Sequence, residues 1–186
     1  MQNSKLKIKP IDMAQIAVCT ALLCVLSPLS IPTPISIAFT LQVLIVLLCA
    51  LILKPLYALT AQILYTLLGF MGLPVFSGWQ SGFGIIASPT GGFLIGFLFA
   101  SFLVSLFKGK CEGKFAVVRY IIVAIVIGIP CIYLPGILGF MLNTGADFVK
   151  AFQMVAALFL PIDVFKCVIA ALFAVPVNLA IKKINK

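Results

Sequence analysis

Six apolar stretches, separated by short segments rich in lysine, proline or glycine, run along almost the whole chain. They leave little polar surface: 63% of the 186 residues are hydrophobic and 9% are charged, whereas a soluble domain carries about 25% charged residues. Most of the stretches approach the roughly 20 apolar residues that a membrane-spanning helix needs. The chain is therefore predicted to be an all-α integral membrane protein, a single domain built as a bundle of six transmembrane helices. These helices are expected at about residues 11–27, 40–53, 55–71, 91–107, 117–138 and 161–182.

The basic residues predict the orientation of the bundle. All of them except Lys150 and Lys166 precede the first stretch, follow the sixth, or lie in the second–third and fourth–fifth connections. They are Lys5, Lys7, Lys9, Lys54, Lys108, Lys110, Lys114, Arg119, Lys182, Lys183 and Lys186. Alternate connections lie on one side of a membrane, and the positive-inside rule makes that side, with both termini, cytoplasmic. The net charge of +9 does not indicate nucleic acid as a partner, because no aromatic–basic module accompanies it.

Several kinds of site are excluded by what the sequence lacks. The six cysteines occur singly, without a Cys-x-x-Cys pair, and there is no histidine. The cysteines are expected to be small packing residues rather than metal ligands or disulfide partners, and the usual general base is missing. No Walker motif is present, so the chain is not expected to hydrolyse ATP. We expect no catalytic residue, no metal and no cofactor.

Asp163 and Lys166 stand three residues apart in the sixth stretch. Residues at this spacing share a helix face, and charges at membrane depth are costly unless they pair or face a polar cavity. With a helix beginning at Pro161, the pair would lie near the external end of the bundle. Three segments with few charges are expected at that end: 28–38, 72–90 and 139–160.

This layout predicts an outward-facing pocket for a small molecule. Asp163 could accept hydrogen bonds from ligand N–H groups, and Lys166 could donate to a carbonyl or carboxylate. Two alternatives need no ligand. Asp163 could stabilise the positive N-terminus of its helix, and Lys166 could extend to the outer interface.

Four further residues are candidates for this pocket. Thr40 and Gln42 stand at the head of the second helix, where polar side chains can orient a ligand or cap the helix. Trp79 offers a flat apolar wall, or else an interfacial anchor. Gly91 belongs to the run Ser88-Pro-Thr-Gly-Gly, where glycines permit tight turns and close backbone approach.

Small residues recur on one side of the first helix, at Ala14, Ala17 and Ala21. The pattern Ala17-x-x-x-Ala21 lets another helix approach closely. Spacing alone favours packing inside the bundle over the docking of a partner.

Taken together and in this order, four motifs resemble the BioY family, the biotin-specific substrate-binding (S) components of energy-coupling-factor (ECF) transporters. They are Phe39-Thr-Leu-Gln42, Gly72-Leu-Pro-Val-Phe-Ser-Gly78, Pro89-Thr-Gly-Gly-Phe-Leu-Ile-Gly-Phe97 and Leu160-Pro-Ile-Asp-Val-Phe-Lys166, and the resemblance covers nearly the whole chain. It departs from the family pattern at Ser88 and at Trp79-Gln80-Ser81, where glycines are expected.

The resemblance implies a function. It implies that the bundle captures biotin outside the cell, in a bacterial plasma membrane, with biotin as transported ligand rather than cofactor. It implies assembly with a transmembrane coupling subunit and two ATPase subunits, with Ala14, Ala17 and Ala21 docking the coupling subunit. In this picture the S component reorients in the bilayer to release the vitamin inside.

Three other interpretations stay open. The chain could be an S component for another vitamin, such as thiamin or riboflavin. It could be a small membrane enzyme acting on a lipid substrate, although such enzymes need several carboxylates or a histidine base and this chain has four acidic residues. It could also be a channel or a purely structural bundle.

Overall fold

The structure, a computed structural model, describes residues 9–32, 37–111 and 115–184. Its helices are α1 (Pro10–Leu26), α2 (Gln42–Ile52), α3 (Pro55–Phe70), α4 (Gly91–Phe107), α5 (Ala116–Val123), α6 (Ile129–Thr144), α7 (Phe148–Phe152) and α8 (Leu158–Ile184). The shorter elements are strands β1 (Ser30–Ile31) and β2 (Phe39–Thr40), 3₁₀ turns η1 (Ser77–Trp79) and η2 (Phe83–Ala87), and π-helical turns η3 (Ala124–Gly128) and η4 (Gln153–Ala157). Lys5, Lys7, Lys114 and Lys186 lie outside the described residues.

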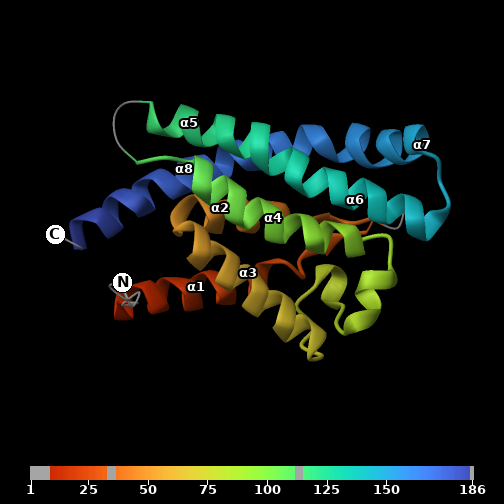
Figure 1. Cartoon of the computed structure of the whole chain (residues 1–186), viewed down its shortest axis with the longest axis horizontal. Helices are drawn as coiled ribbons and strands as arrows, with labels where there is room; N and C mark the ends of the chain where they lie inside the picture. Colours follow the sequence, from red (N-terminus) through yellow and green to blue (C-terminus); the bar gives the residue numbers. More distant parts are fainter. Residues whose placement is uncertain (1–8, 33–36, 112–114, 185–186) are drawn as a thin grey trace, which may run out of the picture.

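The helices lie side by side along the long axis of the molecule (Figure 1). α2 is in the middle and packs against α1, α3, α4 and α8. Most of its apolar side chains are buried, so it forms the centre of the core. The two ends of the described chain lie at the same end of the bundle, and the connections that contain η1, η2 and α7 lie at the other (Figure 1).

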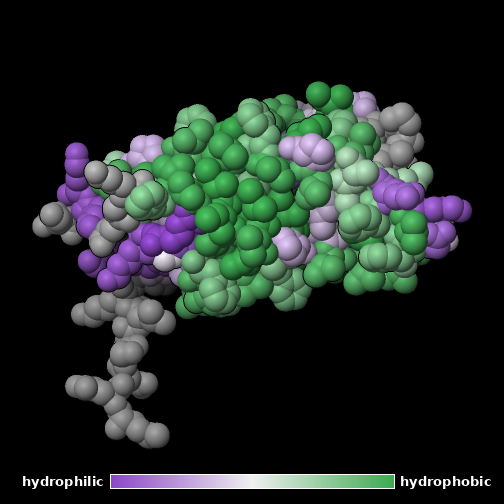
Figure 2. Space-filling model, turned by 90° about the horizontal axis from the view of Figure 1, so that it is seen from above, coloured by the Kyte–Doolittle hydropathy of each residue, from purple (hydrophilic) through white to green (hydrophobic). Residues whose placement is uncertain are grey.

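On the face that Figure 2 shows, a broad apolar belt lies between two more polar ends of the bundle. Among the described residues, two helical runs, 116–144 and 148–183, are long and apolar enough by composition to cross a membrane. α2 has only 11 residues, about 16 Å at 1.5 Å per residue, which is shorter than a bilayer core. The neighbouring helices surround α2, so its shortness leaves little of it at the apolar surface.

The first four helices begin and end within two residues of the expected positions, but the last two are longer than expected. The fifth was expected to end at residue 138 and continues to Thr144; the sixth was expected to begin at Pro161 and begins at Phe148. Residues 139–160 are therefore mostly helical rather than a loop. Only a short connection separates Thr144 from Phe148.

Each of these long helices contains a π-helical turn just before a proline. A proline ring clashes with the carbonyl of the residue four positions earlier and removes one hydrogen bond. For Pro130 and Pro161 that earlier residue lies in η3 and in η4, respectively, the two π-helical turns. A π-helical turn shifts the hydrogen bonds by one residue, which accommodates the proline without ending the helix.

Glycines bring the backbones of α4 and α6 into direct contact. A Cβ added at Gly92 would overlap the carbonyl oxygen of Pro135, and one added at Gly96 would lie 2.7 Å from that of Ile132. Gly139 faces Gly92 from α6 at a similarly short distance. Only residues without a side chain allow two helices to approach this closely. The contact fixes the first part of α4 against residues 132–139 of α6.

We predict that Gly92→Ala destabilises the protein, because the new methyl group must push α4 and α6 apart. Forcing extra carbon into a close-packed interface costs roughly 1–3 kcal/mol. Thermal unfolding of the detergent-purified protein measures the change. Gly84→Ala is the matched control, since a Cβ there meets no atom within 4 Å. Equal stability of the two variants would show that α4 and α6 do not need this close contact.

Candidate ligand-binding site

A small cavity of about 60 Å³ lies between α2, α4, α6 and α8. Its apolar walls come from aromatic and aliphatic side chains: Ile37, Val43, Phe76, Ile85, Phe93, Leu94, Phe97 and Phe159. Polar groups come from Thr40, Gln42, Ser77, Thr90, Tyr133, Asp163 and Lys166. An apolar chamber with a few convergent polar groups is typical of small-molecule sites.

Asp163 and Lys166 form a buried ion pair in the wall of this cavity. The Lys166 Nζ donates to Asp163 Oδ1 over 2.7 Å, and the two residues are only 8% and 3% exposed, respectively. The Tyr133 hydroxyl donates to the other carboxylate oxygen, Oδ2, also over 2.7 Å. Both oxygens of the carboxylate therefore have a donor. Short bonds to charged groups are the strong ones, so this cluster holds its geometry without a ligand.

The pair lies deeper in its helix than expected. Because the helical run begins at Phe148 rather than Pro161, Asp163 and Lys166 are near the middle of 148–184. Neither of the two ligand-free alternatives fits this position. Asp163 is far from a helix N-terminus, and Lys166 is buried with its ammonium on the carboxylate instead of reaching an interface.

Thr40 and Gln42, two of the residues predicted for the site, both line the cavity, and both also have structural partners. The Thr40 hydroxyl accepts from the backbone N–H of Gln42, over 3.3 Å, at the start of α2. The Gln42 Nε2 donates to the Tyr65 hydroxyl over 2.9 Å, and that hydroxyl donates to the Val75 carbonyl over 3.1 Å. These bonds connect the head of α2 to the segment after α3. They hold the Gln42 amide in place in the cavity wall.

A second, outer cavity of about 370 Å³ adjoins the first. The two share Ile37, Ala38, Ser77 and Thr90 as lining residues. The outer one is completed by residues of the connections at this end of the bundle: Ser30, Pro32, Gly78, Gln80, Ser88 and Pro89. The inner cavity alone is smaller than the roughly 300–1,000 Å³ of small-molecule sites, whereas the outer one falls in that range. We call the outer cavity the entrance chamber, because it adjoins the inner cavity that contains the ion pair.

Backbone hydrogen bonds shape the rim of this entrance. β1 pairs with β2 in the register Ser30↔Thr40 and Ile31↔Phe39. The Gly78 N–H donates to the Pro28 carbonyl over 3.2 Å, which joins η1 to the chain before β1. Gly78 has a positive φ of 68°, a conformation that glycine adopts without strain. The rim is therefore built from two segments far apart in sequence.

Two of the predicted site residues lie elsewhere. Trp79 is 61% exposed and lines neither cavity, because its backbone, with φ of 63°, turns the chain at η1. Gly91 is buried but does not line the cavities either. A Cβ there would overlap the carbonyl oxygen of Ile86, so Gly91 allows η2 to pack on the start of α4. This packing lies beside Ile85 and Thr90, which both line the inner cavity.

Tyr133 and Phe159 are pocket residues that sequence reasoning missed. Tyr133 lies 30 positions before Asp163, and no motif joins them. The available signal was a hydroxyl within an apolar stretch, which needs an acceptor when buried. Phe159 falls in the segment expected to be a loop; it stacks at a tilt on Phe39, with ring centroids 4.6 Å apart.

Ala14, Ala17 and Ala21 are all on the exposed side of α1. The opposite side of the helix, with Cys19, Thr20 and Leu23, is buried against its neighbours. Thr20 also donates to the Ala61 carbonyl of α3 over 3.3 Å. The three alanines therefore do not pack inside the bundle within the described chain.

Within the part of the chain that the structure describes, no group of three His, Cys, Asp or Glu side chains could hold a metal ion. The cavities offer polar groups for hydrogen bonding and one ion pair. The arrangement can bind a small, partly apolar molecule that carries both hydrogen-bond donors and acceptors.

Known proteins share this sequence and fold. The BioY family model matches residues 1–183. The chain is 36% identical over 186 residues to the "Biotin transporter BioY2" of Lactococcus lactis subsp. cremoris, covering 100% of this chain and 98% of the relative. It is 38% identical over 178 residues to the "Probable biotin transporter BioY" of Bacillus subtilis, with 94% of each chain covered.

A solved structure has the same architecture. The crystal structure of the S-component for biotin from an ECF-type ABC transporter superposes with a TM-score of 0.84, at 23% identity, covering 96% of this chain and 94% of that one. This likeness confirms the predicted all-α six-helix membrane fold. The named relatives are transporters, in agreement with the expectation that the chain is not an enzyme. With a family model that spans nearly its full length and relatives of this similarity, the chain belongs to the BioY family.

Proposed function

We propose that this chain is the S component of an ECF-type transporter and captures biotin in the pocket above Asp163 and Lys166. The observation that carries the proposal is the buried ion pair, which lines an apolar cavity with an entrance chamber. The family relatives named as biotin transporters give the ligand its identity. Biotin is the transported ligand and no cofactor takes part.

The chemistry of biotin suits this pocket. Its ureido ring carries two N–H donors and one carbonyl, its second ring is an apolar thioether, and its tail ends in a carboxylate. Asp163 accepts from an N–H group, and Lys166 donates to a carbonyl or carboxylate oxygen. Phe93, Phe97 and Phe159 supply apolar walls for the rings and the methylene chain. Thr40 and Gln42 offer further hydrogen bonds at the head of α2.

The charge distribution supports an outward-facing pocket in a bacterial plasma membrane. Basic residues gather at the end of the bundle where the described chain begins and ends, among them Lys9, Lys54, Lys110 and Lys182. The positive-inside rule assigns that end to the cytoplasm. The pocket entrance is formed by connections at the opposite end, so it opens to the outside.

Delivery of biotin requires partners. This chain has no ATPase motif, so a transmembrane coupling subunit and two ATPase subunits drive its reorientation in the bilayer. The exposed side of α1 with Ala14, Ala17 and Ala21 docks the coupling subunit, because small side chains allow a second helix to come close.

Asp163→Asn is predicted to weaken biotin binding by at least 100-fold. The substitution removes the charge that holds the buried Lys166 ammonium, and breaking one side of a buried pair costs roughly 2–5 kcal/mol. Calorimetric titration of the delipidated, ligand-free protein with biotin measures the affinity. Asp147→Asn is the matched control: Asp147 pairs with Lys150 at the same spacing but over 3.8 Å and exposed. Unchanged affinity in Asp163→Asn would remove this residue from the site.

The same titration tests the alternatives. Saturable one-to-one binding of biotin, not displaced by thiamin or riboflavin, supports the proposal. Tighter binding of another vitamin would keep the S-component architecture and discard biotin. In a separate activity assay, metal-dependent turnover of a lipid would indicate an enzyme instead.

Tyr133→Phe is predicted to weaken biotin binding about 10-fold, less than Asp163→Asn does. The variant keeps the aromatic ring but leaves one carboxylate oxygen without its donor, and a hydrogen bond to a charged group contributes roughly 1.5–3 kcal/mol. The titration described above measures it. An effect as large as that of Asp163→Asn would mean that the hydroxyl contacts biotin itself.

Replacing Ala17 and Ala21 together by leucine is predicted to leave biotin binding intact and to lower uptake at least 10-fold. The bulky side chains would keep the coupling subunit away from α1. Uptake of labelled biotin by cells that express the whole transporter measures the effect. Ala180→Leu, at another exposed alanine on α8, serves as control. Normal uptake with leucine at 17 and 21 would rule out docking through this face.

A further inference from the structure

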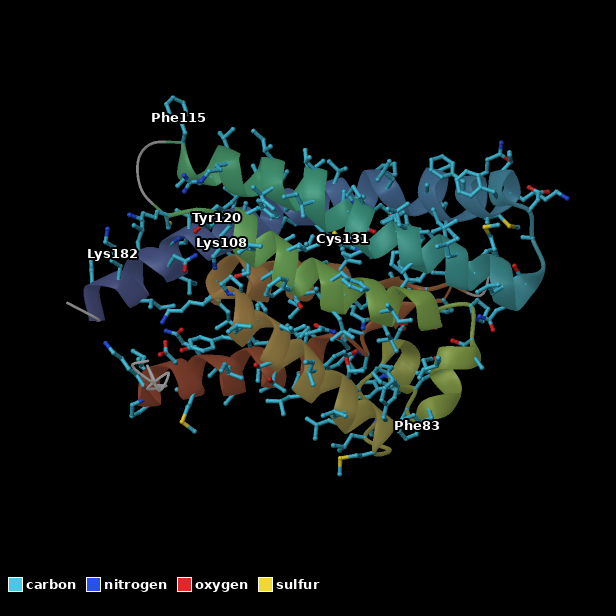
Figure 3. The ribbon with its side chains drawn as sticks, in the orientation of Figure 1. Phe83, Lys108, Phe115, Tyr120, Cys131 and Lys182 are labelled. Carbon is cyan, nitrogen blue, oxygen red and sulfur yellow. The ribbon has the colours of Figure 1, made fainter. Side chains whose placement is uncertain are left out.

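A separate cavity of about 470 Å³ opens at the end of the bundle opposite the biotin pocket. It lies among α1, the α2–α3 turn, the α4–α5 connection and α8. Its lining carries five lysines and one carboxylate: Lys9, Lys54, Lys108, Lys110, Lys182 and Asp12. Figure 3 labels Lys108, Tyr120 and Lys182 at this end of the molecule. Nothing in the proposed transport of biotin uses this cavity.

The single carboxylate in the lining is already engaged. Asp12 Oδ1 accepts from the Lys54 Nζ over 3.2 Å. Its Oδ2 accepts from the Tyr57 hydroxyl and from the Lys9 backbone N–H, each over 3.3 Å. Asp12 thus offsets one positive charge at most, and the cavity as a whole stays strongly positive.

Lys108 forms the inner wall, where burial lowers the pKa of its ammonium to about 7. Its Nζ donates to the carbonyls of Ala50 and Leu51, over 3.2 and 2.9 Å, and also to that of Leu53. These acceptors are neutral carbonyls that hold the Lys108 Nζ at the C-terminus of α2. The positive charge of the cavity therefore comes mainly from the other lining lysines, Lys9, Lys54, Lys110 and Lys182. Arg119 adds another cation behind Gly109. Its Nε and Nη2 are buried and have no hydrogen-bond partner among the described residues.

The cavity lies where the apolar belt ends. Figure 2 shows the hydrophilic residues of this end directly beside the apolar flank. Two exposed apolar residues, Met13 on α1 and Leu179 on α8, directly follow lining residues in the sequence. A ligand with a phosphate at the height of the lysines and acyl chains along the belt would match both surfaces.

We propose that this cavity binds the phosphate headgroup of an anionic phospholipid of the cytoplasmic leaflet. Lysines from four separate elements converge on it, and each lysine near an anionic lipid surface contributes about 1 kcal/mol. Its hollow shape and its position at the edge of the belt favour a lipid over an acidic protein segment, which would need no apolar flank. The bound lipid links α1 to α8 at this end of the bundle.

The test compares two double variants of the delipidated protein. Lys110→Gln with Lys182→Gln removes two charges from the cavity. Lys150→Gln with Lys183→Gln removes two charges outside it and serves as control, since neither residue lines the cavity. Size-exclusion profiles and far-UV circular dichroism confirm that both variants fold. Native mass spectrometry then measures retention of phosphatidylglycerol against phosphatidylcholine.

We expect the wild-type protein and the control to retain phosphatidylglycerol selectively. The cavity variant should bind it roughly 10- to 30-fold more weakly, the effect of about 1 kcal/mol for each lysine. Equal loss in both variants would indicate diffuse charge attraction and overturn the proposal. Displacement of the bound phosphatidylglycerol by inorganic phosphate alone, at constant ionic strength, would indicate a soluble-anion site instead. Unchanged lipid retention, with loss of coupling-subunit assembly in the cavity variant alone, would assign the cavity to an acidic protein partner.

Discussion

The pocket depends on how closely α4 and α6 approach each other. Gly92 and Gly96 let the α4 backbone rest on the carbonyls of Pro135 and Ile132. In the absence of a hydrophobic drive between helices in lipid, such packing is one of the few forces that join them. Tyr133 comes to the cavity on one of these helices, and Phe93, Leu94 and Phe97 come on the other. Wider spacing would pull the Tyr133 hydroxyl away from Asp163.

The buried ion pair lies at the centre of this frame. Two charges removed from water are costly, and their attraction offsets the cost only when geometry is good and the remaining lone pairs are satisfied. Lys166 and Tyr133 each take one oxygen of Asp163, so the cluster meets that condition before a ligand arrives. Ligand binding then needs a rearrangement of existing hydrogen bonds rather than the creation of new charge. That favours specificity, because a molecule without matching donors and acceptors would leave the pair unsatisfied.

The sequence predicted the fold well wherever apolar length and proline position agree. The first four helices, the grouping of lysines at one end, and the pairing of Asp163 with Lys166 all follow from local pattern. The start of the last helix did not, because a π-helical turn lets the chain continue through Pro161 and has no visible signature in a single sequence. Tyr133 could not be found because its partner is distant in sequence. Trp79 was misplaced because its side-chain direction depends on a turn at η1 with positive φ.

Pairing Lys166 with Asp163 also has an electrical consequence. An elementary charge carried across a membrane does work of about 2.3 kcal/mol for every 100 mV. A lone lysine or aspartate at this position would tie any movement of the empty pocket to the voltage of the cell. The neutral pair carries no net charge, so in the transport proposed above it adds no voltage-dependent energy when the empty pocket changes sides. The carboxylate of the proposed cargo, biotin, would add such a term to the pocket.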